Sequence, residues 1–224
     1  MKVLAGVLVA TVVAFPAMAQ KTATARLQAA TTDLHEMMNA SDKGIPQDLM
    51  AKASCVVVVP NLKAGGFIVG GEYGKGFFSC RKPSGVGWSA PGSIRMSGGK
   101  FGLLIGGKET DVIMLVMNKK GMDHLLSDKF QIGGEASAAA GPVGRSSSAM
   151  TDATLNAEIL TYSRSRGVFG GLDIGGAAVT SDEDSNRELY GSKISNKEIL
   201  ETNPKVPAEA QPFIHELDRI SYRK

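Results

Sequence analysis

The sequence predicts an α+β domain in which a curved, glycine-rich antiparallel β-sheet closes toward a barrel and helices from both chain ends pack against it. The order of segments is helices, many strands, then helices. Within the strand region, an apolar residue, any residue, Ile or Val and two glycines recur at 67–71, 103–107, 130–134 and 172–176. Apolar β-formers that run into paired glycines indicate strands that bend or approach another backbone closely. The copies are unequally spaced, which argues against a fixed structural repeat, so we expect one domain over residues 20–224.

Residues 1–19 have the order of a secretory signal peptide. Lys2 is followed by an apolar run from Val3 to Phe15 and then by small residues up to Ala19, as in a leader that is removed on export. The run is too short to remain in a bilayer as a spanning helix. We expect cleavage between Ala19 and Gln20, and an exported protein, periplasmic or secreted, that can lie at the periphery of a membrane.

An N-terminal helical region is predicted over about residues 22–53. The segment 22–39 is apolar on one face, at steps of three and four residues, through Ala23, Leu27, Ala30, Leu34 and Met37. This spacing indicates an amphipathic helix. A second, short helix is expected to begin at Ile45 and Pro46, because proline suits the first helical turn.

A β-rich core is predicted over about residues 54–181. β-branched and aromatic residues mark the expected strands, which are 55–59 (ending at Pro60), 67–73, 76–80, 88–96, 100–105, 111–117, 130–139, 158–164 and 167–180. The nearly unbroken apolar run 111–117 is expected to be buried on both faces near the centre of the sheet. We also expect a helical turn at 122–126, a loop at 141–148 and an acidic surface turn at 181–187.

A C-terminal helical segment is predicted over about residues 195–222. Ser195 and Glu198 fit a capping box at its start, and Phe213, Leu217 and Ile220 repeat the helical spacing. We expect these helices to pack on the curved sheet or to plug it. The glycine pattern fits both a sheet that encloses a cavity for an acyl chain and a sheet with a filled core.

Composition and motifs argue against several functional classes. Lys and Arg number 25 against 22 Asp and Glu, a net charge of +3, which is too small to indicate nucleic-acid binding. The three histidines stand at no metal-ligand spacing, and no nucleophile motif is present. Asp182, Asp184 and Asn186 copy the first ligands of a calcium loop, but its glycine and final Glu are missing, so calcium is only weakly indicated. We expect no enzyme activity, no metal and no cofactor.

Cys55 and Cys80 are the only cysteines of the chain. Each lies close to a strand-like run, and an exported protein leaves the reducing cytosol, so a disulfide is favoured. It would add on the order of 3 kcal/mol to the free energy of unfolding by the chain-entropy estimate. The alternative is a pair of buried thiols that pack as small hydrophobic groups.

Basic residues gather at the ends of the predicted strands and in turns. Strand ends share a rim, and a rim with several Lys and Arg side chains can hold lipid phosphates. An ordinary solvated surface is the alternative. These residues are Lys63, Lys75, Arg81, Lys82, Lys100, Lys119, Lys120, Arg145, Arg164 and Arg166.

An ordered series of motifs covers nearly all of the chain that follows the leader. It consists of Cys55–Pro60, the glycine-rich 70–76, Trp88–Pro91, Gly141–Arg145, Ala157–Ser163 and Leu189–Gly191. Through these motifs the chain resembles the SYLF domain family, as an exported member of bacterial type. That family is also known through a yeast actin-binding protein.

The resemblance implies a protein without enzyme activity that binds membrane lipids, notably phosphoinositides in eukaryotic members, with an amphipathic N-terminal helix that contacts the membrane. On this chain, that helix would be the segment that carries Leu27, Leu34 and Met37. For an exported protein, the expected ligands are phospholipid head groups or another anionic lipid, and we do not expect actin as a partner.

Two other hypotheses stay open at this point. A structural or protein-interaction domain of the bacterial cell envelope would bind a protein partner, whose identity the sequence does not give, and would ignore lipid vesicles. An enzyme without a known motif would show a polar pocket in which an acid, a base and a nucleophile lie together.

Overall fold

The computed structural model describes residues 22–40, 44–67, 69–101, 106–144, 156–165, 168–172 and 174–221. The predicted leader with its cleavage site at Ala19 and Gln20 lies outside these ranges, as do Arg145 and Arg166. The helices are α1 (Ala23–Asn39), α2 (Gln47–Lys52), α3 (Lys119–Leu125), α5 (Glu183–Tyr190), α6 (Asn196–Thr202), the 3-10 helix η2 (Ala208–Ala210) and α7 (Gln211–Ile220). Within these residues, no helix has the length and apolar character needed to cross a bilayer.

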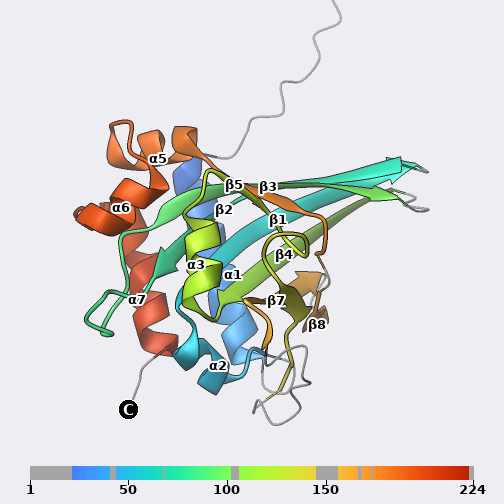
Figure 1. Cartoon of the computed structure of the whole chain (residues 1–224), viewed down its shortest axis with the longest axis horizontal. Coiled ribbons are helices and arrows are strands. Elements are labelled where there is room, and N and C mark those ends of the chain that lie inside the picture. Colours follow the sequence, from blue (N-terminus) through green and yellow to red (C-terminus); the bar gives the residue numbers. More distant parts are fainter. Residues whose placement is uncertain are drawn as a thin grey trace, which may run out of the picture.

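The described strands form one sheet. They are β1 (Cys55–Phe67), β2 (Val69–Cys80), β3 (Gly92–Phe101), β4 (Gly106–Val116), β5 (Lys129–Gln131), β6 (Ala138–Ala140), β7 (Ile159–Ser165), β8 (Val168–Gly171) and β9 (Ala178–Ser181). Their order is β5-β9-β3-β2-β1-β4-β7-β6, with β8 paired to β7. The pairing is antiparallel except between β6 and β7. Figure 1 shows the long strands β1 to β4 running side by side and extending beyond the helices.

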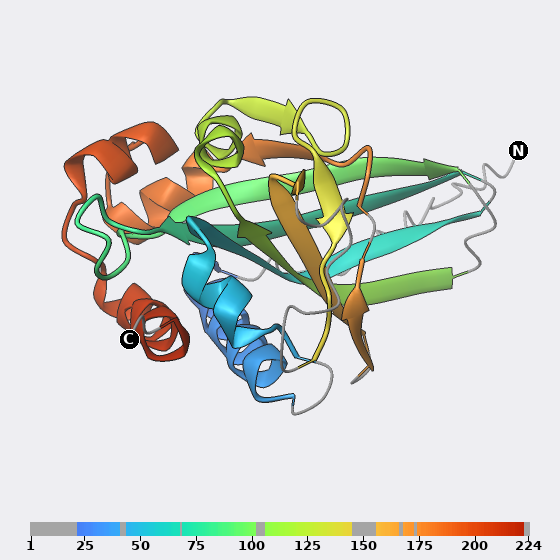
Figure 2. The same cartoon turned by 60° about the horizontal axis from the view of Figure 1, so that its bottom comes forward.

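The sheet is curled, and it is covered on both faces. Figure 2 shows α1, α2 and α7 on one side of the sheet and α3 with β5 on the other. The predicted α+β fold, with a curved sheet and helices from both chain ends packed against it, is confirmed.

Side chains of β1 alternate between two apolar layers. Val56 and Val58 lie in the layer that also contains Leu27 and Phe213 of the helices. Val57 and Val59 lie in the opposite layer, with residues such as Ile94, Met114 and Val179. The long strands therefore read as continuous apolar runs because each of their faces is buried.

The first strand does not end at Pro60, as the sequence predicted. It continues to Phe67 through an irregularity between Val59 and Leu62. Asn61 has a φ of 52° there, and its amide donates to the Asp111 side chain at 2.9 Å. Such a bulge lets a strand continue past a proline, which has no N–H to donate.

The paired glycines have two different roles. Gly70–Gly71 and Gly106–Gly107 lie in β2 and β4, whereas 133–134 and 175–176 lie in turns. In those turns Gly133 and Gly176 have φ values of 79° and 88°, which favour glycine. Only two of the four glycine pairs therefore lie in strands, and the expectation that all four pairs bend strands was too broad.

The segment 181–187 is not a surface turn, because α5 begins at Glu183 and ends at Tyr190. Gly191, with a φ of 71°, caps its C-terminus. Asp182, Ser185 and Asn186 are buried. At the next helix the predicted N-terminal cap is present, since the Ser195 hydroxyl accepts from the amide of Glu198 at 3.1 Å. A left-handed glycine after α5 is a common helix end, and its signal was present in the sequence.

Candidate functional site

Four of the predicted basic residues come together at one end of the sheet. Strands β2 and β4 lie on either side of β1 and are both antiparallel to it, so their last residues lie at the same end. Arg81 and Lys82 follow β2, and Lys119 and Lys120 begin α3 just after β4. Ser54 joins the two strand ends, because its amide donates to Val116 O at 2.7 Å and its carbonyl accepts from the Arg81 amide at 2.8 Å. We call Arg81, Lys82, Lys119 and Lys120 the basic end.

A hollow of about 310 Å³ lies at the basic end. It is lined by Ser54, Arg81, Gly85, Lys119 and Met122, and we call it the basic hollow. Two basic residues, a serine and a methionine therefore border one space. Such a lining can accept an anionic group that is attached to an apolar neighbour.

Arg81 is held rigidly at the wall of the basic hollow. Its Nε donates to Ala53 O at 3.3 Å, and its Nη2 donates to Ala51 O at 3.3 Å and to Ser221 O at 3.0 Å. The guanidinium also lies 4.5 Å from the ring centre of Trp88. The accepting carbonyls belong to the C-terminal ends of α2 and α7, where helix carbonyls lack partners within the helix. Arg81 thus joins both helices to the sheet in addition to lining the hollow.

The two lysines of α3 are exposed, but each contacts a carboxylate. Lys119 Nζ lies 2.8 Å from Asp123, and Lys120 Nζ lies 2.6 Å from Glu158. Burial disfavours the charged form of Glu158, but contacts with Lys120, Ser137 and His124 outweigh it and hold the pKa of this carboxyl below its ordinary value. The positive charge of the basic end is therefore partly neutralised.

Lys75 and Arg164 do not lie at the basic end. Lys75 Nζ lies 2.9 Å from Asp182, and its side chain is 11% exposed. Arg164 pairs with Asp33, Glu36 and Asp111 and is 16% exposed. Both side chains form internal ion pairs between elements, so we withdraw them from the lipid-binding assignment.

The apolar face of α1 points into the protein. Leu27, Leu34 and Met37 are at most 2% exposed, and the helix packs against α7 and the sheet. Arg164 binds Asp33 and Glu36 of this helix. The expectation that Leu27, Leu34 and Met37 contact a membrane is therefore wrong for this conformation, because the same apolar stripe fills the core.

The cysteines form the predicted disulfide. Cys55 and Cys80 lie opposite each other on β1 and β2, and their sulfurs are bonded. Their chain neighbours Ser54 and Arg81 line the basic hollow. The cross-link therefore fixes the two strand ends that form one wall of the hollow.

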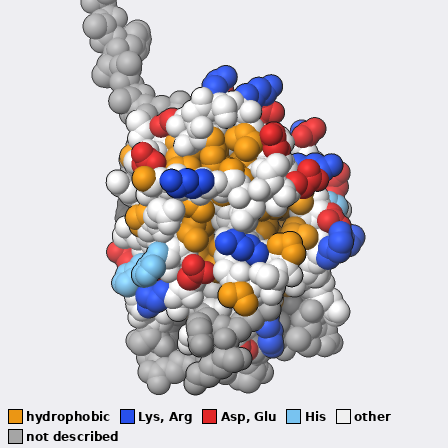
Figure 3. All heavy atoms as spheres, turned by 90° about the vertical axis from the view of Figure 1, so that its left-hand side faces the viewer, with side chains coloured by type: hydrophobic (Ala, Val, Ile, Leu, Met, Phe, Trp, Pro, Cys, Tyr) orange, Lys and Arg blue, Asp and Glu red, His pale blue; other side chains and the backbone are white. Residues whose placement is uncertain are grey.

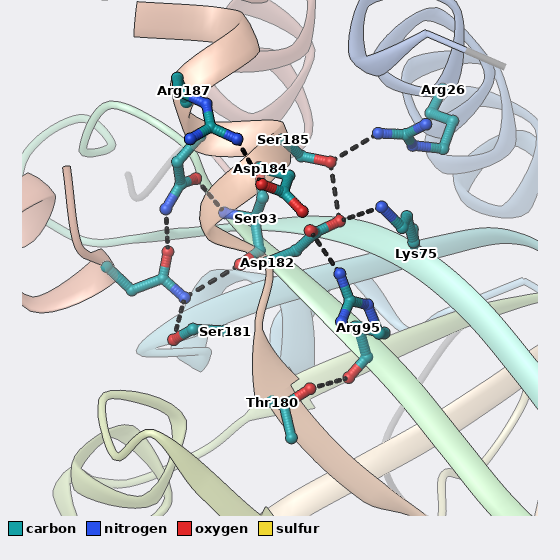
Figure 4. A network of polar contacts seen from close by, with 12 residues as sticks. Arg26, Lys75, Ser93, Arg95, Thr180, Ser181, Asp182, Asp184, Ser185 and Arg187 are labelled. Atoms are coloured by element: carbon teal, nitrogen blue, oxygen red, sulfur yellow. Dashed lines mark hydrogen bonds and ion pairs between the residues drawn. The ribbon is translucent and has the colours of Figure 1, made fainter. Parts of the chain in front are cut away.

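A buried polar network was missed by the sequence reading. Figure 4 shows Asp182 between Lys75, Arg95 and Ser185, with Arg26 of α1 bound to Ser185. The Asp182 oxygens lie 2.9 Å from Lys75 Nζ and Arg95 Nη2, and the Ser185 hydroxyl donates to Asp182 at 2.7 Å. Burial disfavours the charged carboxylate, but these contacts outweigh it and keep the pKa of Asp182 below its ordinary value.

The weak calcium pattern does not form a loop of ligands. Asp182 accepts from the basic groups of the network, and Asn186 binds Ser93 and Asn196. Asp184 pairs with Arg187. The three side chains are engaged with different partners, and the calcium interpretation is wrong.

Charge is mixed on the face that carries the C-terminal helices. Figure 3 shows apolar side chains at the centre of that face, with Lys and Arg interspersed with Asp and Glu around them. On this side Lys193 pairs with Glu183 and Lys197 with Glu201. These exposed pairs are a useful reference for the lysines of the basic end.

Sequence reasoning did not find every residue of the basic hollow. Ser54, Gly85 and Met122 were not singled out, although Ser54 adjoins a cysteine and Gly85 lies in a turn with φ 75°. Lys63 lies elsewhere, with its Nζ 3.8 Å from Glu109. The hollow depends on how the strand ends and α3 meet in space, for which the sequence has no local signal.

Comparisons with known proteins place these observations in a family context. Residues 97–220 match the family described as Ysc84, Las17-binding protein actin regulator. The chain is 32% identical over 185 residues to Protein YSC84 of Saccharomyces cerevisiae, covering 81% of this chain and 39% of that protein. LAS seventeen-binding protein 3 of Saccharomyces cerevisiae is 30% identical over 185 residues, with 81% and 40% covered.

Animal proteins show a similar relationship. SH3 domain-containing YSC84-like protein 1 of Homo sapiens is 30% identical over 184 residues, covering 82% of this chain and 53% of that protein. The chain thus spans about two fifths of the yeast relatives' length and about half of the human relative's.

Proposed function

This chain belongs to the Ysc84 family, which is the SYLF family that its motifs resemble, and we propose that it is a non-catalytic protein that binds anionic membrane lipids through the basic end. The observation that supports this proposal is that Arg81 and Lys119 line the basic hollow, at the strand ends that also carry Lys82 and Lys120. Anionic head groups are the ligands that such a group of side chains recognises.

Different roles follow from the geometry of the side chains. Arg81 is held by carbonyls and by Trp88, so it offers an anion a charge that is already in place. Lys82 and Lys119 are exposed and supply mobile point charges near a membrane surface, worth about 1 kcal/mol each. Met122 gives the ligand an apolar neighbour inside the hollow.

The leader pattern of residues 1–19 also supports a proposal about where the protein acts. We propose that the protein acts after export, in the periplasm or outside the cell, at the periphery of a membrane. Phospholipid head groups or other anionic envelope lipids are then the available ligands.

A second candidate function is protein binding. It is favoured by the family's description as Las17-binding actin regulators and by the name of the yeast relative LAS seventeen-binding protein 3. In this alternative, the chain is an interaction domain of the cell envelope that recognises a protein partner. For a protein that acts after export, we propose an envelope protein rather than actin as this partner.

Vesicle co-sedimentation tests the lipid proposal. The chain without residues 1–19 is mixed with vesicles of graded anionic content at low and moderate salt. We expect binding to rise with anionic lipid and to fall with salt. The double variant Lys82→Glu, Lys119→Glu should bind at least about tenfold more weakly, since each lost lysine is worth about 1 kcal/mol.

A matched control uses the face of the C-terminal helices. Lys193 and Lys197 are exposed and paired with carboxylates, as Lys119 is. Lys193→Glu, Lys197→Glu makes the same change in net charge and should bind almost as well as the parent. Equal losses of vesicle binding in both double variants would show that overall charge, and not the basic end, causes the effect. If the parent binds no vesicles under any condition, the protein-partner alternative is favoured.

A further inference from the structure

The long strands continue past the helices at the end of the sheet that lies opposite to the basic end. Figure 1 and Figure 2 show β1 to β4 reaching beyond α1 and α2. Strands β1 and β2 pair Cys55 with Cys80 next to the basic end and Phe67 with Val69 at the other end. At about 3.3 Å per residue, these two ends lie about 40 Å apart along β1. We call the positions 63–67, 69–73, 97–101 and 106–109 the distal end.

The register of the strands arranges the distal end in rows. Directly paired residues, and residues two apart in one strand, share a face of the sheet. Val69 is paired with both Phe67 and Phe101, so three apolar residues form the last row of one face, which we call the distal face. The two rows behind it on the same face are Gly107, Gly65, Gly71 and Gly99, and then Glu109, Lys63, Tyr73 and Ser97.

The distal face is open. In its glycine row, Gly65, Gly71 and Gly99 are exposed. Among the described residues, a Cβ at Gly99 would meet no atom within 4 Å, and a Cβ at Gly71 would meet the carbonyl oxygen of Gly98 alone, at 3.6 Å. Tyr73 in the next row is 45% exposed. The helices that cover this side of the sheet nearer its middle therefore do not reach the last rows.

The opposite face of the same strands is covered. Gly70 is buried, and Glu72 is 5% exposed. A Cβ at Gly98 would lie 3.4 Å from the Cα of Ala177, which precedes β9 and belongs to one of the two apolar layers. The distal end thus has one covered face and one open face that ends in three apolar residues. An apolar row at the edge of an open face is typical of a surface that meets a partner.

The residues of the open rows suit the interfacial region of a phospholipid bilayer. Tyr73 combines an apolar ring with a polar hydroxyl, as the aromatic residues of membrane interfaces do. Lys63 and Lys108 are exposed, and Lys63 Nζ lies 3.8 Å from Glu109 in a pair with both partners exposed, so it can turn to a lipid phosphate. The glycine row has no side chains, which lets lipid approach the backbone closely.

The edges of the distal end limit how deeply it can enter a membrane. Strand β3 pairs with β9 only over 94–97, and β4 pairs with β7 only over 111–116. Among the described strands, the outer edges of β3 at 98–101 and of β4 at 106–109 therefore have no strand partner. Unpaired backbone groups need water or head groups and are not tolerated in the hydrocarbon core. Contact at the level of the head groups, with the last row pointing inward, satisfies both requirements.

We propose that the distal end is a second membrane-contact element, which inserts Phe67, Val69 and Phe101 into the interfacial region of one leaflet. It goes beyond the proposed function, because it lies at the opposite end of the sheet from the basic hollow and acts through burial of apolar surface. Binding through it should persist on uncharged phosphatidylcholine vesicles and at high salt, where contacts made by charge weaken.

Fluorescence tests whether the last row enters a membrane. Trp88 is the only tryptophan of the chain and is buried, so a second tryptophan reports on its own surroundings. In Phe101→Trp, we expect a shift to shorter wavelength with phosphatidylcholine vesicles and quenching when the acyl chains carry bromine. The matched variant Val86→Trp, at a position that is 79% exposed beside Gly85 of the basic hollow, should show neither change on these uncharged vesicles.

Co-sedimentation with phosphatidylcholine vesicles at high salt measures the contribution of the row. Phe67→Ser with Phe101→Ser should bind at least about tenfold more weakly than the parent, because two phenylalanines lose their transfer out of water. Val86→Ser also removes an exposed apolar side chain, at the opposite end of the sheet, and should bind as the parent does. Urea unfolding of each variant shows whether a loss of binding reflects a loss of folding, and the fluorescence of Phe101→Trp does not depend on that comparison.

The outcomes separate the distal end from the basic end. Quenching of Phe101→Trp without any dependence of binding on anionic lipid would remove the proposed function and support the distal contact. Binding that depends on anionic lipid, with Phe101→Trp unquenched on every vesicle, would overturn the distal contact alone. A dimer in the absence of lipid that Phe67→Ser with Phe101→Ser dissociates would assign the row to a second copy of the chain, and would also overturn the proposal.

Discussion

Removal of the Asp182 charge should destabilise the protein strongly, although the residue does not line the basic hollow. The Asp182 side chain is fully buried and receives Lys75, Arg95 and the Ser185 hydroxyl. In Asp182→Asn, the shape of the side chain is kept but its charge is lost. The Lys75 ammonium, 11% exposed, then stays buried without its carboxylate, whereas Arg95 at 37% exposed can turn to water.

Breaking a buried ion pair by removing one partner costs about 3–5 kcal/mol. A domain of this size is stable by roughly 5–15 kcal/mol, so the variant should lose a large part of its free energy of unfolding. With a urea dependence of roughly 2–3 kcal/mol per molar, the unfolding midpoint should fall by about 1–2 M.

Urea unfolding followed by circular dichroism measures this loss, and two further variants sharpen it. Asp184→Asn removes a carboxylate two residues away whose pair with Arg187 is exposed, and it should cost at most about 0.5 kcal/mol. Lys75→Met combined with Asp182→Asn removes both charges and should be more stable than Asp182→Asn alone.

The stability that the Asp182 carboxylate contributes should depend on pH. Because the pKa of Asp182 is lowered in the folded protein, its contribution to stability is present above the ordinary range of Asp, near pH 3.9. It is lost as the pH falls through the folded pKa. Asp182→Asn should therefore lack this part of the acid destabilisation. A cost below about 1 kcal/mol at pH 7 with an unchanged urea dependence would refute the role of the network.

Two further predictions concern the covalent and steric construction of the long strands. Reduction of the disulfide, or the double change Cys55→Ser and Cys80→Ser, should lower the free energy of unfolding by about 3 kcal/mol. Urea unfolding with and without reductant measures this loss. An unchanged urea midpoint would show that the cross-link adds nothing to stability. Gly76→Ala should cost at least about 2 kcal/mol, because its Cβ would lie 2.2 Å from Val58 O, whereas Gly99→Ala, with no atom within 4 Å, should be nearly neutral; similar midpoints for both would contradict the close strand approach.

Local sequence patterns predicted the helices and strands better than they predicted which parts of the protein pack against each of them. The apolar stripe of α1 was visible from residue spacing, but Leu27, Leu34 and Met37 fit a membrane surface and a protein core equally well. The choice depends on α7 and the sheet, which cover that stripe. Spacing along one helix has no information about which distant segment packs on it.

The basic residues show the same limit. Lys75 and Lys119 both lie near strand ends or turns in the sequence, yet one is paired inside the protein and the other is exposed. The partner of Lys75 is Asp182, at the other end of the β-rich region, and nothing local to either residue signals the pairing. Arg81 and Lys119 could be assigned to one rim only because β2 and β4 point the same way in the sheet.

The disulfide also determines how β1 and β2 are aligned. Most sheets keep their alignment because one face is apolar and the other polar, so that a slip by one residue exposes the core. In Val56–Val59 both faces are apolar and buried, and a slip would exchange one valine for another. Cys55 lies directly opposite Cys80, and a bond between these two positions forbids any other alignment of the strands that meet it.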